Sequence, residues 1–140
     1  MTEEESQQRS VWIVAGETSG DGYGASLARE LHRLAPELTV RGMGGPQMRA
    51  AGVETFVDST ELGIIGFWEC LKHLFFFMGL LRRMTKRAAE ERPETVVLID
   101  YPGFNLQLAK RLHKLGIRVV WYVSPQVWAW KTGRIWKLAK

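Results

Sequence analysis

The stretch VWIVAGETSG, residues 11–20, decides the fold, because an apolar run of β-branched and aromatic residues passes directly into a polar loop that contains glycine. Similar runs recur along the chain and predict strands at Val11–Ala15, Leu38–Val40, Val53–Val57, Val96–Ile99 and Val119–Val123. Segments with helical periodicity separate the strands, at Ala25–Leu34, Gln47–Ala51, about Phe67–Glu91 and Leu106–Leu115. This alternation predicts an α/β fold with a parallel sheet covered by helices.

Length and composition indicate a single globular domain. The chain has 140 residues, 46% of them apolar and 24% charged, which excludes disorder and collagen. Cys70 is the one cysteine in the sequence, so an internal disulfide is excluded, and no histidine or cysteine stands near it at metal-ligand spacing. We therefore expect a reducing compartment and no metal site.

The ends of the chain and its charge exclude other classes of protein. Residues 1–10 are polar and acidic where a signal peptide is basic and then apolar, and we expect a flexible N-terminus there. The apolar run Leu74–Leu81 is far shorter than the roughly 20 residues that cross a bilayer. The net charge of +4 is spread over separate basic clusters without a nucleic-acid motif, so we expect no nucleic-acid partner.

The loop after the first predicted strand, AGETSGDG at 15–22, is the first candidate site, because ligands of open parallel sheets bind beyond the carboxyl ends of the strands. In the structural interpretation Gly16 makes the turn, and Thr18 with Asp21 forms a pair like a capping box. In the functional interpretation the helix N-terminus binds sugar or phosphate oxygens. Glu17 is the residue that capping does not explain.

Two glycine-rich stretches have weaker interpretations. GDGYGA at 20–25 satisfies the dinucleotide pattern G-x-G-x-x-A, but its glycines come late after the strand, and the next strand ends near Arg41 rather than an acid. An oxidoreductase with Arg41 as a ligand of the NADP 2′-phosphate stays an open alternative. GMGGP at 42–46 predicts a tight turn before a helix that begins at Pro46, with close approach to a ligand as the second interpretation.

Two further loops contain residues that suit catalysis or ligand binding. In IDYPGFN at 99–105, Asp100 ends a buried strand, where a carboxylate suits a general base or, equally, a cap for the next helix. In SPQVWAW at 124–130, Ser124 and Pro125 predict a helix start. Tryptophan beside serine and glutamine in such a loop also suits sugar rings or acyl chains.

The long predicted helix carries two apolar stripes. At about 100° per residue we assign one stripe to the core, namely Phe67, Leu71, Leu74, Phe75 and Met78. The other stripe is either a second buried face, a partner contact or a surface that enters a membrane, and the basic residues beside it favour the membrane. The predicted membrane-contact residues are Phe76, Phe77, Leu80, Arg83, Met84 and Arg87.

Taken in order, the motifs AGETSGD, RGMGGPQM, ELGIIGFWE, IDYPGFN and SPQVWAW closely resemble the front half of lipid A disaccharide synthase, from about Val11 to the last residue. The resemblance implies the N-terminal Rossmann-like domain of a GT-B fold, with helices on both faces of the sheet. It also implies an inverting transferase without a metal or other cofactor. Its substrates would be UDP-diacylglucosamine and diacylglucosamine 1-phosphate, and it would work at the cytoplasmic face of the inner membrane.

The resemblance also assigns roles to individual residues. Asp100 matches the proposed base that activates the acceptor hydroxyl, and Glu17 matches the essential glutamate of the first loop. The acceptor side would be lined by Ser19, Asn105, Ser124, Gln126 and Trp128.

The resemblance implies a second domain with most of the UDP-sugar site, and this sequence stops before it. We therefore expect residues 11–140 to form the acceptor-side domain, with a partner domain or an oligomer as a possible complement. Two interpretations stay open at this point. The chain is either a front piece of the enzyme or a reduced relative that binds lipid, or a partner, without transferring sugar.

Overall fold

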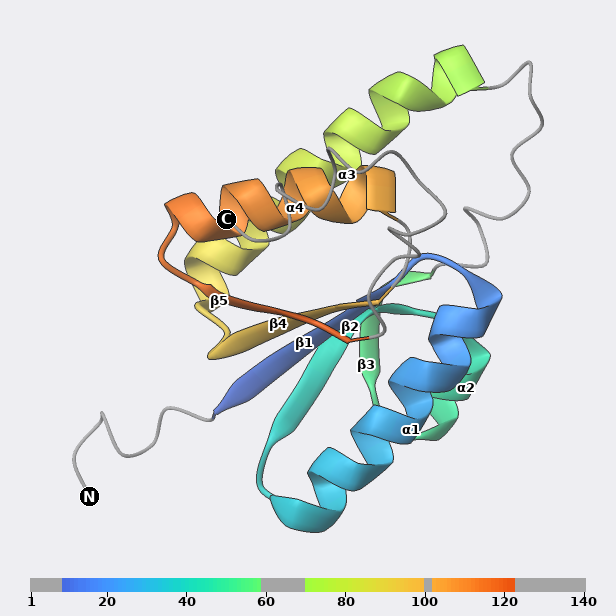
Figure 1. The fold of residues 1–140 in the computed structure, drawn as a ribbon, viewed down its shortest axis with the longest axis vertical. Helices are drawn as coiled ribbons and strands as arrows, with labels where there is room; N and C mark the ends of the chain where they lie inside the picture. The colour runs from blue at the N-terminus through green and yellow to red at the C-terminus, as the bar shows by residue number, and fades with distance from the viewer. Residues whose placement is uncertain (1–8, 59–69, 100–101, 123–140) are drawn as a thin grey trace, which may run out of the picture.

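A computed structural model describes residues 9–58, 70–99 and 102–122, and Figure 1 shows them as one sheet between two layers of helices. The strands are β1 (Ser10–Ala15), β2 (Thr39–Gly44), β3 (Glu54–Asp58), β4 (Thr95–Ile99) and β5 (Arg118–Trp121). The helices are α1 (Thr18–Leu34), α2 (Pro46–Ala50), α3 (Cys70–Glu91) and α4 (Pro102–Lys114). The sheet has the order β3-β2-β1-β4-β5, and every neighbouring pair is parallel, which confirms the predicted fold class.

Two apolar layers hold the helices to the sheet. Because successive strand residues point to opposite faces, Trp12 and Val14 pack under α3 and α4, whereas Ile13 packs under α1 and α2. The central strands β1 and β4 are buried on both faces, and their sequences are therefore continuous apolar runs. These runs are the reason that the sequence predicts them well.

Helix α1 and strand β2 have other boundaries than predicted, and close packing explains both differences. Helix α1 begins at Thr18 rather than Ala25, with its glycines inside the helix. A Cβ on Gly24 would lie 2.6 Å from the Met48 sulfur, so glycine lets α1 approach α2. Strand β2 continues through the predicted turn to Gly44, and at Gly42, where φ is 155°, a Cβ would collide with the Ile13 carbonyl oxygen.

Part of the prediction for α3 is wrong: Phe76 and Arg83 are exposed as expected, but two residues of each predicted stripe are not where the prediction placed them. Leu80 and Met84, expected at a membrane, are 2% and 1% exposed and belong to the core, and Phe77 packs against that core. Phe75 and Met78, expected in the core, are 81% and 46% exposed. Ala88, near the end of α3, packs against the sheet. The apolar residues on the same side of the helix as Ala88 are therefore the buried ones.

Candidate functional site

The strand order places a topological switch point between β1 and β4. The connection after β1 leads to β2 on one side, and β4 lies on the other side, with Ala15 and Ile99 in register at the two strand ends. Helix α1 leaves β1 over one face of the sheet, and α4 follows β4 over the opposite face (Figure 1). Open α/β sheets bind ligands in the crevice that such a divergence creates. Glu17 lies two residues after Ala15, and Asp100 directly follows Ile99 in the sequence.

Glu17 occupies the N-cap position of α1 with extended backbone dihedral angles, and its side chain makes no capping hydrogen bond. Glu17, Thr18 and Ser19 are all exposed. The carboxylate is therefore available to a ligand at the amino end of a helix, where unpaired N–H groups also point. As the sequence indicates, capping of α1 does not explain the glutamate side chain at position 17.

The predicted capping box of Thr18 and Asp21 is wrong. Its side chain is 3% exposed and does not pair with Thr18 to open α1. Instead, its carboxylate accepts hydrogen bonds from the backbone N–H groups of Gly45 at 2.8 Å, Gln47 at 3.0 Å and Met48 at 3.0 Å. One carboxylate in the first turn of α1 thus caps α2, and it ties the loop after β1 to the loop after β2.

Asn105, predicted to contact the acceptor, is fully buried near the start of α4. Its Nδ2 donates a hydrogen bond to the Ile99 carbonyl oxygen at 3.3 Å. The bond joins the end of β4 to α4, the two elements that precede and follow Asp100 in the sequence. Asn105 therefore ties α4 to the end of β4, and its direct contact with substrate stays a prediction.

The remaining predicted site residues, Asp100, Ser124, Gln126 and Trp128, lie outside the described residues. The Tyr122 N–H donates to the Leu98 carbonyl oxygen at 3.0 Å, so the last described residue before Ser124 is bonded to β4.

A charged network on the α3 side of the sheet has no signal in the sequence, because its members are far apart in the chain. Glu91 accepts a hydrogen bond from the Trp12 indole at 3.2 Å and pairs with Arg87 at 2.6 Å and with Arg41 at 3.4 Å. Arg41 also pairs with Glu54 at 3.1 Å. Burial lowers the pKa of the Arg41 guanidinium, but the hydrogen bond and charge of Glu54, together with Glu91, raise it above its ordinary value.

This network removes the support for the oxidoreductase alternative. Arg41 is engaged by two carboxylates and is not available to a 2′-phosphate. The glycines of the G-x-G-x-x-A pattern lie inside α1 rather than in a phosphate-binding turn. Close packing explains Gly20, where a Cβ would lie 3.2 Å from the Ala15 Cβ.

Within the described residues, no three His, Cys, Asp or Glu side chains gather in a way that suits a metal ion. The same part of the chain holds no helix that is both long enough and apolar enough to cross a bilayer.

Solved glycosyltransferases share this fold. The chain superposes on the glycotransferase of kitacinnamycin with a TM-score of 0.59 and 18% identity, covering 90% of this chain and 34% of that one. For CalG4, the calicheamicin glycosyltransferase, the TM-score is 0.54 with 16% identity, and the coverage is 94% and 37%. The fold is therefore a Rossmann-like α/β domain, such as these two glycosyltransferases contain.

The sequence comparisons narrow this fold class to one family. Residues 11–140 match the family described as Lipid-A-disaccharide synthetase, and the chain belongs to it. The lipid-A-disaccharide synthase of Trichlorobacter lovleyi is 46% identical over 132 residues, and that of Nitrosococcus oceani is 48% identical over 130. These matches cover 94% and 93% of this chain but 34% of each relative, so the chain spans about one third of their length.

Proposed function

We propose that this chain is the acceptor-binding part of a lipid-A-disaccharide synthase. The complete enzyme would join UDP-2,3-diacylglucosamine to 2,3-diacylglucosamine 1-phosphate and release UDP and lipid A disaccharide 1-phosphate. The observation that supports the proposal is the family match over residues 11–140, together with the register of Ala15 and Ile99, the strand ends that precede Glu17 and Asp100 in the sequence. The proposal needs no cofactor.

In the proposed reaction Asp100 accepts the proton of the acceptor hydroxyl as its oxygen attacks the anomeric carbon of the donor. The bond from that carbon to UDP breaks on the opposite side, so the anomeric configuration inverts. Glu17, exposed at the end of α1, acts beside it as the second essential carboxylate. Ser19, Ser124, Gln126 and Trp128 would bind the acceptor sugar, whereas Asn105 ties the start of α4 to the end of β4.

The first test separates binding from transfer. The purified 140-residue chain should bind a short-chain diacylglucosamine 1-phosphate but release no UDP, because transfer requires the donor in near-attack geometry. Calorimetry measures binding, and chromatography measures UDP. Binding that persists unchanged in Glu17→Gln and Ser19→Ala together would contradict the acceptor assignment, and UDP release would contradict the need for further donor-binding residues.

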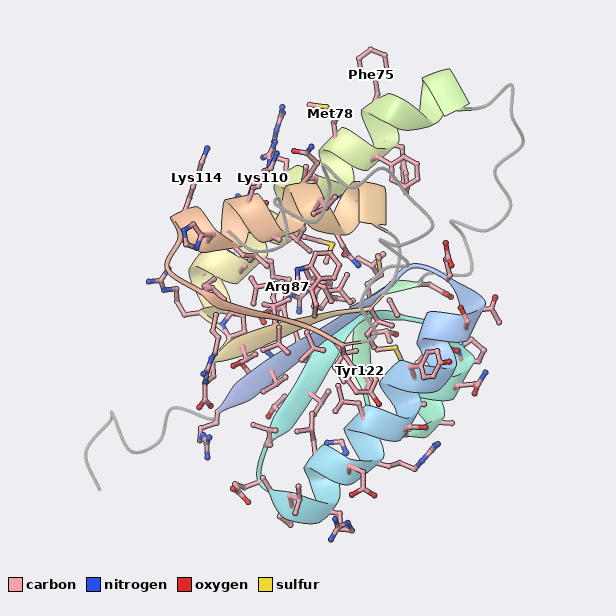
Figure 2. The ribbon with its side chains drawn as sticks, in the orientation of Figure 1. Phe75, Met78, Arg87, Lys110, Lys114 and Tyr122 are labelled. Carbon is pink, nitrogen blue, oxygen red and sulfur yellow. The ribbon has the colours of Figure 1, made fainter. Side chains whose placement is uncertain are left out.

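A noncatalytic lipid-binding module is the second candidate, and the outer surface of α3 and α4 favours it. Figure 2 shows Phe75 and Met78 of α3 pointing away from the sheet, on the same side as Lys110 and Lys114 of α4. The outer surface of α3 continues with exposed Arg82 and Lys86. Apolar side chains beside cations are typical of surfaces that bind anionic bilayers, and both candidate functions need a peripheral position on the inner membrane.

Replacing Phe75 and Met78 together with serine should leave the melting temperature nearly unchanged and weaken binding to anionic vesicles, because these side chains are exposed. Lys110→Gln with Lys114→Gln should also weaken it, by roughly 1 kcal/mol per lost cation at low salt. Sedimentation with anionic and neutral vesicles measures both effects.

The matched control for the membrane test is Leu80→Ser, which lies on the buried face of the same helix. We expect this variant to lose about 3 kcal/mol of stability, because it replaces a buried leucine with a smaller polar side chain. If the parent chain fails to sediment with anionic vesicles, the membrane assignment of this surface is wrong.

A further inference from the structure

A pocket of about 160 Å³ lies between edge strand β3 and helix α3 and is partly open to solvent. It lies on the sheet face opposite α1 and α2 and belongs to neither loop of the candidate site. Its lining among the described residues is apolar at the base and basic at the rim, and consists of Phe56, Val57, Leu80, Arg83, Met84 and Arg87.

The two arginines of the pocket differ in their contacts with acidic side chains. Arg87 is already engaged, because its Nε donates to a Glu91 carboxylate oxygen at 2.6 Å and its guanidinium lies 4.2 Å from the centre of the Phe56 ring. Glu91 is held in turn by Trp12 and Arg41. Figure 2 shows Arg87 between α3 and the sheet, and Arg87 lines the pocket together with Arg83.

Arg83 stands one turn earlier on the same side of α3, is exposed and makes no ion pair with any residue that the structure describes. A guanidinium presents several N–H donors in a fork that suits phosphate or carboxylate oxygens. The charge that the pocket offers to a ligand is therefore that of Arg83, because Glu91 neutralises Arg87.

The lining and the volume of the pocket limit the size of the apolar group that a ligand can place there. Leu80 and Met84 are buried, and Phe56 and Val57 are half-buried, so an alkyl group in the pocket would contact carbon on several sides. An apolar cavity of about 150 Å³ in another protein holds benzene, which corresponds to roughly six carbon atoms.

We propose that this pocket binds the short apolar end of an anionic amphiphile, with the phosphate or carboxylate of that ligand on Arg83. The apolar base excludes a purely ionic ligand, since it offers no further hydrogen-bond donor. A purely apolar ligand would gain nothing from the exposed guanidinium of Arg83, which makes no ion pair among the described residues. The inference rests on the lining of the pocket and not on the transfer reaction.

The test titrates the ¹⁵N-labelled chain with hexyl phosphate, inorganic phosphate and 1-hexanol, and follows the backbone amide signals. We expect hexyl phosphate to shift residues 56–57 and 80–87 and to bind at least about tenfold more tightly than inorganic phosphate. It should bind about threefold to tenfold more tightly than 1-hexanol. Equal binding of both phosphates, or shifts centred on Phe75 and Met78 instead, would overturn the proposal.

Variants locate the two parts of the ligand. Arg83→Gln should weaken hexyl phosphate about threefold to tenfold and leave 1-hexanol unchanged, whereas the neighbouring Arg82→Gln, outside the pocket, should change neither. Val57→Phe, at a half-buried position, should fill the pocket and abolish binding of both ligands, with a melting curve to verify the fold. Equal effects of Arg82→Gln and Arg83→Gln would overturn the assignment of the anion to Arg83.

Discussion

Replacing Asp21 with alanine should lower the free energy of unfolding by about 3 kcal/mol and the melting temperature by about 10 °C. The side chain is almost fully buried and accepts three backbone N–H groups at the start of α2. Alanine leaves the Gly45 and Met48 N–H groups buried without these acceptors, and a buried donor that lacks a partner is costly. Thermal denaturation followed by circular dichroism measures the loss.

The control for this prediction is Glu17→Ala, four residues earlier in the same loop and helix. Glu17 is exposed at the N-cap of α1 and makes no capping hydrogen bond, so its removal should change stability by less than about 0.5 kcal/mol. Asp21→Asn should fall between the two, because an amide has one acceptor oxygen in place of two. A stable Asp21→Ala variant would mean that water or rearrangement satisfies the start of α2.

The strands could be predicted because each central strand is buried on both faces. Val11–Ala15 and Val96–Ile99 are apolar throughout, and the structure places β1 and β4 side by side at these residues. The boundaries near glycine could not be predicted. Close approach of α1 to the sheet and to Met48, which depends on tertiary structure, keeps Gly20 and Gly24 inside the helix.

The predicted orientation of α3 was wrong for a physical reason. Residues 74–81 read LFFFMGLL, and this segment is apolar nearly all around the helix, so its periodicity alone does not decide which side meets the sheet. The second half of the helix contains the information. There Met84 and Ala88 are apolar among charged residues, and continuing their stripe backward leads to Leu81, Leu80 and Phe77, the face that the structure buries.

At the candidate site, the sequence predicted residues that stand directly after a strand and missed contacts between distant elements. Glu17 could be singled out because no local capping rule uses it, and the structure leaves its side chain exposed. The role of Asp21 could not be found, because its hydrogen-bond partners lie more than 20 residues away along the chain, at Gly45 and beyond. The network around Glu91 joins α3 to β1 and β2 and likewise has no local signal.

Replacing Asp100 with asparagine should reduce turnover by roughly 10²–10⁴-fold with little change in KM, because the amide cannot accept the proton of the acceptor hydroxyl. The measurement needs a complete enzyme. A chimera of residues 11–140 with the remaining part of the Trichlorobacter lovleyi synthase, of which the match covers 34%, provides one. The stability of the variant should be unaffected if Asp100 acts on the substrate rather than as a cap.

Asp58→Asn is the matched control in the same chimera. Asp58 also ends a strand of this sheet, but it ends the edge strand β3 and pairs with Arg49 at 3.4 Å, away from the switch point between β1 and β4. Its replacement should change turnover by less than about threefold, because a partly exposed ion pair contributes little. Near-normal turnover in Asp100→Asn, or an equal loss in both variants, would remove Asp100 from the role of base. A selective loss at Asp100 would tie proton transfer to the end of β4, the strand at which the chain changes direction across the sheet.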